Sequence, residues 1–243
     1  MADGILLIHA FPLDATMWAP QVEALGKTTK VIAVNLPGFG GAGSSGKVMT
    51  MDAAADHVAN AAKDAGISSA LICGLSMGGY VALAISRNHP RLAAGYIFAN
   101  TKAGADDEAG ADRRRQLAAR LNSEGSDFLV ASPPPLLSDG APAALLDHVK
   151  SIIKAQPPES IAAAALGMAE RPESAPDLAK ISVPTLVITG SKDTLIPPEA
   201  TKPMADGIKG ARYEVIEGVG HLSNLEAPDR FNTLLREHWA KLK

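Results

Sequence analysis

Six short stretches of the chain are apolar at successive positions and show no alternation of polar and apolar side chains. They are Ile5–Ile8, Val31–Val34, Ala70–Cys73, Tyr96–Ala99, Thr185–Thr189 and Tyr213–Ile216. Strands that are buried on both faces of a parallel sheet have this pattern. The six stretches therefore predict strands of a parallel sheet.

Helical patterns lie between these strands, at Met17–Leu25, Met51–Ala65, Gly78–Asn88 and Ala227–Leu242. In the last of them, five mostly apolar side chains recur at helical spacing and form one face of an amphipathic helix: Phe231, Leu234, Leu235, His238 and Trp239. Strands that alternate with helices indicate an α/β fold, with helices on both faces of a parallel sheet.

Residues 102–180 interrupt this alternation, because they contain no strand-like stretch. Their helical patterns are Asp112–Leu121, Pro142–Lys154 and Glu159–Glu170. So long a helical interval is too much for a simple crossover between two strands. We expect residues 1–101 and 181–243 to form the core, with residues 102–180 inserted as a helical cap.

Composition narrows the class of protein. The chain has 243 residues, of which 47% are hydrophobic and 20% charged, and this excludes a disordered chain and a coiled coil. The net charge of −3 offers no basic excess, so no nucleic-acid partner is expected. A single cysteine, Cys73, excludes an intramolecular disulfide and a cysteine-based zinc site. With no basic N-terminal region and no apolar run of roughly 20 residues, we expect a soluble, cytoplasmic protein without a membrane partner.

The strongest chemical signal is the G-x-S-x-G motif at residues 74–78, which directly follows one predicted strand and directly precedes a helix. A serine on such a tight turn has strained backbone, so its neighbours must be small. The helix behind it begins with unpaired N–H groups, which suit a developing oxyanion. Ser76 is therefore the candidate nucleophile.

To act as a nucleophile, a serine needs a base that takes its proton, and the base needs an acidic partner that orients it and stabilises its charged form. His221 follows the last predicted strand and Asp193 follows the one before, so both should reach the same sheet edge as Ser76. Asp106 and Asp107 are competing acids, although a solvated acidic cluster on the cap explains them more simply.

The other histidines have simpler interpretations. His9 ends the first strand, where packing or a hydrogen bond beneath the next loop accounts for it. Four more lie in or beside helical patterns and are interpreted as surface or structural residues: His57, His89, His148 and His238.

With these motifs, the chain resembles the α/β-hydrolase superfamily, in particular small bacterial esterases and enol-lactonase-like members. The order Ser76, Asp193, His221 is that family's nucleophile, acid and base order. The segment His9–Asp14 is similar to its H-G-x-P oxyanion loop, with alanine in place of glycine at position 10. Residues 35–40 are similar to its D-x-P-G-x-G turn, with Asn35 in place of aspartate. Residues 167–172, leading to 183–185, look like the end of the helical cap.

The resemblance implies an oxyanion hole formed by the backbone N–H groups of Phe11 and Met77; the Met77 assignment also follows from its place directly after the nucleophile. Most members begin with an antiparallel strand pair, but only eight residues precede His9. We therefore expect about six strands, all parallel, with Val31–Val34 at an edge.

These features predict a serine esterase that acts on a small-molecule ester of short to medium acyl chain, without a metal or cofactor. The small apolar cap face around Ile161, residues 162–166 and Met168 suits such a substrate if it faces Ser76. An enol-lactonase or C–C bond hydrolase on the same triad remains open. A slow-turnover receptor that signals through the cap is the alternative from a different class.

Overall fold

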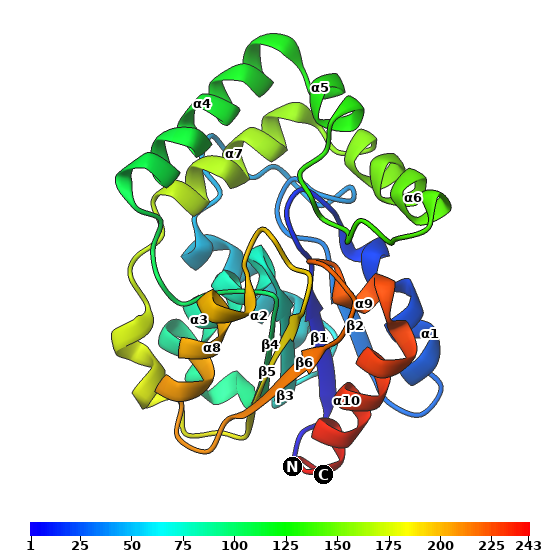
Figure 1. Cartoon of the computed structure of the whole chain (residues 1–243). Helices are drawn as coiled ribbons and strands as arrows, with labels where there is room; N and C mark the ends of the chain where they lie inside the picture. Colours follow the sequence, from blue (N-terminus) through cyan, green and yellow to red (C-terminus); the bar gives the residue numbers. More distant parts are fainter.

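A six-stranded, wholly parallel sheet forms the centre of the molecule, in the order β2-β1-β3-β4-β5-β6. The computed structural model describes all 243 residues (Figure 1). The strands are β1 (Gly4–Ile8), β2 (Val31–Val34), β3 (Ala70–Leu75), β4 (Ala93–Ala99), β5 (Thr185–Gly190) and β6 (Arg212–Ile216). The α/β class, the six parallel strands and the edge position of Val31–Val34 are confirmed.

Helices cover both faces of the sheet (Figure 1). One face carries α1 (Ala19–Leu25) and α10 (Pro228–Ala240), and the other carries α2 (Met51–Asp64), α3 (Met77–Asn88) and α8 (Pro198–Gly207). The five side chains of the predicted face of α10 are buried, as its spacing requires. No helix is both long and apolar enough to cross a bilayer.

Helix α8 was not among the expected elements, because Pro197 and Pro198 resemble a rigid loop. Pro198 instead occupies the first turn of the helix, where a missing N–H removes no hydrogen bond. The structure adds five short elements that the pattern did not predict: η1 (Ala15–Trp18), η2 (Pro90–Leu92), α5 (Asp127–Ala131), η3 (Ala175–Lys180) and α9 (Ser223–Glu226).

Four helices gather beyond the carboxyl edge of the sheet (Figure 1). They are α4 (Glu108–Glu124), α5 (Asp127–Ala131), α6 (Ala143–Lys154) and α7 (Pro158–Ala169). Helices α4 and α7 pack along each other, and the apolar residues 161–165 of α7 are buried. We call these four helices and their connections the cap; its exact boundaries at residues 102 and 180 remain a prediction.

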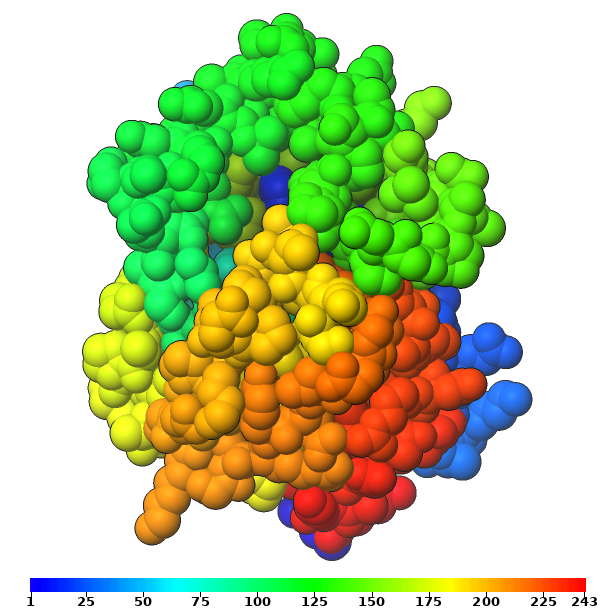
Figure 2. Space-filling view, viewed as in Figure 1, coloured from blue at the N-terminus to red at the C-terminus, as the bar shows by residue number.

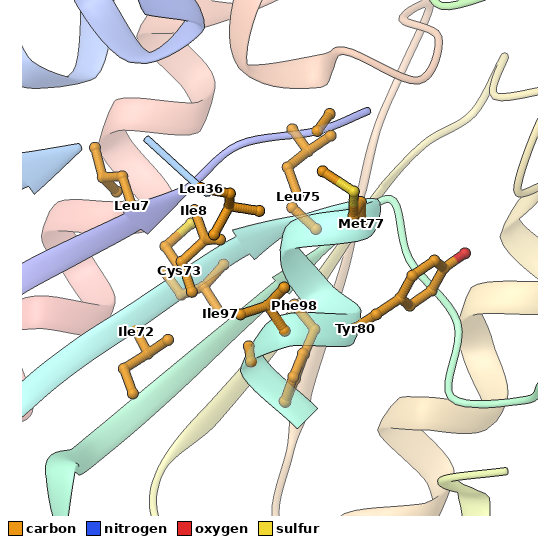
Figure 3. Packing of buried hydrophobic residues seen from close by; sticks show 14 of the residues in the cluster. Leu7, Ile8, Leu36, Ile72, Cys73, Leu75, Met77, Tyr80, Ile97 and Phe98 are labelled. Carbon is orange, nitrogen blue, oxygen red and sulfur yellow. The ribbon is translucent and has the colours of Figure 1, made fainter. Parts of the chain in front are cut away.

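The core lies on the strands that lead to the predicted site. Every residue of β1 and β3 is buried. Figure 3 shows Ile8, Cys73 and Ile97 from three neighbouring strands packed together, while the ring of Tyr80 extends away from this cluster. Cys73 is the small core residue that a buried strand position predicts, and burial raises the pKa of its thiol.

Candidate active site

Ser76 occupies the turn that joins β3 to α3. Its backbone has φ 56° and ψ −115°, a left-handed conformation that is strained for any residue with a side chain. Two hydrogen bonds hold the turn: the Ser76 N–H donates to Ala99 O at 2.9 Å, and Thr101 Oγ1 donates to Ser76 O at 2.8 Å. The predicted strand–turn–helix context of the motif is therefore present.

The glycines around Ser76 are required by close backbone packing. A Cβ at Gly74 would overlap the backbone of Gly78, and a Cβ at Gly78 would overlap the backbone of Ile8. A Cβ at Gly79 would overlap Thr101. These contacts explain the small residues that flank the serine.

His221 and Asp193 meet at the same edge of the sheet. Nδ1 of His221 lies 2.8 Å from Oδ2 of Asp193, and both side chains are buried, with 2% and 0% exposure. The N–H groups of Leu195 and Ile196 donate to Oδ1 of Asp193, at 3.0 and 2.9 Å. The carboxylate is thus fixed by the loop that follows β5.

The competing acids have other roles. Asp107 caps α4, because its carboxylate accepts a hydrogen bond from Gly110 N–H at 2.7 Å. Asp106 contacts Arg114 and Arg171, and its side chain is only 7% exposed. The interpretation of Asp106 as part of a solvated cluster is wrong, because Arg171 arrives from the distant end of the cap and buries it.

Asn100 is a further residue of the site that the sequence analysis missed. It directly follows β4 with φ 46°, and its amide donates to Asp193 Oδ2 at 2.9 Å and to Gly220 O at 3.3 Å. Its Oδ1 accepts a hydrogen bond from Ser223 Oγ at 2.6 Å. A polar residue at the carboxyl end of a buried parallel strand was the signal available in the sequence.

The backbone N–H groups of Phe11 and Met77 donate no hydrogen bond within the protein. Met77 is the first residue of α3, so its N–H is one of the unpaired donors at a helix N-terminus. Phe11 follows Ala10, whose φ is not positive, so alanine fits where the family has glycine. Both predicted donors are therefore free for a ligand.

A cavity of about 370 Å³ brings these residues together. Phe11, Ser76 and His221 all line it. Figure 2 shows a hollow between the cap and the segment near residue 195, with atoms of the N-terminal segment visible inside it. No hydrogen bond joins Ser76 Oγ to the His221 ring; catalytic hydrogen bonds of this kind often tighten only when substrate binds.

Glu226 connects the cap to the loop that carries His221. Its Oε1 accepts hydrogen bonds from Gly220 N–H at 2.8 Å and from Ser138 N–H at 3.1 Å, and its Oε2 accepts one from the Ser138 hydroxyl. The N–H of Leu222 donates to Leu136 O in the cap at 2.9 Å.

His9 lies beneath the oxyanion loop, as its position at the end of β1 predicts. Its Nε2 accepts a hydrogen bond from Leu36 N–H at 3.1 Å, and its Nδ1 lies 3.0 Å from Ala10 O. This pair of partners requires the neutral ring with the proton on Nδ1. Burial lowers the pKa of His9 to about 4.

Asn35 uses both ends of its amide in the turn after β2. Its Oδ1 accepts a hydrogen bond from Ala15 N–H at 2.8 Å, and its Nδ2 donates to Gly40 O at 2.9 Å. A carboxylate cannot make the second bond, so asparagine is suited to this turn.

The comparisons agree with this architecture. The model of the alpha/beta hydrolase family matches residues 5–234. A pimeloyl-[acyl-carrier protein] methyl ester esterase of Neisseria meningitidis is 30% identical over 96% of this chain and 92% of its own length. The 3-oxoadipate enol-lactonase 1 of Acinetobacter baylyi is 29% identical over 95% of this chain and 86% of its own.

Among solved structures, a thermophilic esterase from Thermogutta terrifontis, with malate bound, superimposes with a TM-score of 0.94. It is 38% identical and is matched over 100% of this chain and 92% of its own. The family model covers nearly the whole chain, and the proteins similar to the chain include esterases and enol-lactonases. The chain is a hydrolase and belongs to the alpha/beta hydrolase family.

Proposed function

We propose that this hydrolase is a serine esterase that cleaves carboxylic esters of short to medium acyl chain through an acyl-serine intermediate. One observation carries the proposal. Ser76, held in a strained turn, lines the same cavity as the His221 ring, and the Asp193 carboxylate lies 2.8 Å from the other side of that ring.

In the proposed mechanism, Ser76 Oγ attacks the ester carbonyl while Nε2 of His221 accepts the hydroxyl proton. Asp193 accepts the Nδ1–H hydrogen bond, which fixes the tautomer and stabilises the imidazolium that forms. The imidazolium then gives its proton to the departing alcohol. Water repeats the sequence on the acyl-serine, with His221 again as the base.

The N–H groups of Phe11 and Met77 are the proposed oxyanion donors. Both lack a partner within the protein, which supports this role because a bound oxyanion would satisfy them. The start of α3 adds the positive end of a helix dipole. Loss of one such donor typically raises the barrier by about 3 kcal/mol.

The size and lining of the cavity support the proposed chain length. About 370 Å³ lies near the lower end of the range for ligand pockets. Met168 is the residue of the predicted cap face that lines the cavity, whereas residues 161–165 are packed inside the cap. The similar proteins named for methyl ester and enol-lactone substrates both act on carboxylic ester bonds.

The test is a series of p-nitrophenyl esters with acyl chains from C2 to C12. We expect kcat/KM to peak at short or medium chains and Ser76→Ala to lower kcat by at least about 10⁴-fold. Ser123→Ala, on the exposed surface of α4, is the matched control and should retain the wild-type rate. An equal rate in wild type and Ser76→Ala would refute the proposal.

An enol-lactonase is the second candidate, because enol-lactonases are similar to this chain in both sequence and structure. An enol-lactonase from Burkholderia xenovorans LB400 is 25% identical, with a TM-score of 0.86 over 99% of this chain. A ring ester and p-nitrophenyl acetate, compared by kcat/KM on the same preparation, separate the two. Faster opening of the ring would favour the lactonase.

A further inference from the structure

The cavity wall next to the cap carries an excess of positive charge. Lys102, Arg113 and Arg114 line the cavity, and Asp106 is the one acidic side chain that does so. With His221 neutral, three cations against one carboxylate leave a formal charge of +2 in the wall. The whole chain has a net charge of −3, so the wall differs in sign from the rest of the protein.

Asp106 cannot neutralise this wall, because several cations share it. It contacts Arg114, it lies 3.1 Å from Arg171 and it lies 3.4 Å from Lys102 Nζ. Arg171, only 4% exposed, stacks over the ring of Tyr80 at 4.1 Å and adds a further positive charge behind the wall. Burial alone would raise the pKa of Asp106, but the hydrogen bonds from Arg171 and Arg114 outweigh it and hold this pKa well below its usual range.

Arg113 differs from its neighbours on α4. Arg114 is paired with Asp106, and Arg115 is paired with Glu108 and Asp112. Arg113 has no acidic side chain within 4.0 Å, although it lines the cavity and is exposed to solvent. Its guanidinium is therefore free to bind an anion.

The remaining lining is largely apolar, with Phe11, Leu117, Leu136, Met168 and Ile196 among its residues. Such a cavity suits a ligand with a short apolar chain and one anionic group. A guanidinium binds a carboxylate through two parallel hydrogen bonds, and such charge-assisted bonds are roughly twice as strong as neutral ones. Low-dielectric walls also concentrate the positive field inside a cleft.

From this arrangement we infer that the preferred substrate is an ester that also carries a free carboxylate, such as a monoester of a short dicarboxylic acid. Arg113 binds the carboxylate, and Lys102 and Arg114 supply the surrounding positive field. The ester carbonyl then lies at Ser76. This inference rests on the proposed esterase function and specifies its substrate class.

Direct binding tests the anion site without turnover. Glutarate is titrated into the wild-type protein by calorimetry, with the neutral diamide glutaramide as the matched ligand. We expect glutarate to bind more tightly, and Arg113→Gln to weaken it by about ten-fold or more. Arg115→Gln, whose side chain does not line the cavity, is the control and should bind glutarate as the wild type does. Equal binding of the two ligands, or equal affinity in Arg113→Gln and wild type, would overturn the inference.

Kinetics tests the substrate class. The ratio of kcat/KM for monoethyl glutarate to that for ethyl pentanoate compares two acyl groups of equal length. We expect a ratio well above one, which falls by about ten-fold in Arg113→Gln and stays unchanged in Arg115→Gln.

The outcomes separate the two proposals. Hydrolysis of both esters with a ratio near one would overturn the substrate class and leave the esterase intact. Hydrolysis of neither, with p-nitrophenyl esters still cleaved, would overturn the substrate class alone. Only a loss of p-nitrophenyl ester hydrolysis as well would overturn the esterase, and the glutarate titration would still decide whether the cavity binds a carboxylate.

Discussion

Asn100 donates its side-chain amide to Oδ2 of Asp193, the same oxygen that lies against Nδ1 of His221. The Asp193 carboxylate is therefore held from three directions: by Asn100, by the histidine and by two backbone N–H groups. Asn100 does not line the cavity, so its proposed role is positioning.

Asn100→Gly removes this amide but keeps a residue that tolerates the left-handed backbone at φ 46°. We expect kcat to fall by about ten-fold or more with little change in KM, because the carboxylate loses one of the bonds that orient it. Steady-state kinetics on a p-nitrophenyl ester measures the effect. Thr233→Gly, at an exposed position on α10, is a control for the loss of a side chain alone. A change in KM with kcat unaltered would contradict the positioning role.

Gly78→Ala should destabilise the protein by about 1–3 kcal/mol, because the added methyl group would overlap the backbone of Ile8 and force β1 and α3 apart. Gly43→Ala is the matched control, since a Cβ there meets no atom within 4 Å and φ is not positive. Urea unfolding measures both changes. Equal midpoints for the two variants would show that the turn can relax at no cost.

Stability should decrease as the pH falls from about 6.5 to about 4. The folded state holds His9 neutral with its pKa lowered to about 4, whereas the unfolded chain takes up a proton near 6.5. The contribution of His9 is therefore complete above pH 6.5 and is lost as the pH falls through that interval, by up to about 3 kcal/mol.

His9→Gln keeps an acceptor for Leu36 N–H and removes the titrating group. Urea unfolding at a series of pH values should give a shallower slope for this variant than for the wild type between pH 6.5 and 4. Parallel slopes would mean that other groups cause the pH dependence.

The strands and the turn at Ser76 could be predicted from the sequence because their signals are local. Residues 70–73 are buried on both faces, and the glycines at 74 and 78 stand where neighbouring backbone leaves no room for a side chain. The positions of Asp193 and His221 followed from one rule, that parallel strands end at the same edge of a sheet. Helix α8 was missed because proline at a first helical turn looks like proline in a loop.

The charged wall of the cavity could not be predicted because its pairing is long-range. Asp106 and Arg171 are 65 positions apart, and only the packing of α4 against α7 brings them together. The role of Asn100 likewise depends on a loop that follows a different strand. A net charge taken over the whole chain hides a local excess of the opposite sign.

Glu226 couples the position of the cap to that of the catalytic loop. Because its carboxylate binds Ser138 of the cap and Gly220 beside the histidine at once, the loop at residues 132–142 cannot lift away without breaking bonds that support His221. On this side of the cavity, the cap and the loop that carries His221 are therefore held together by one side chain. A movement of the cap loop here would also displace His221, the residue proposed to take the proton from Ser76.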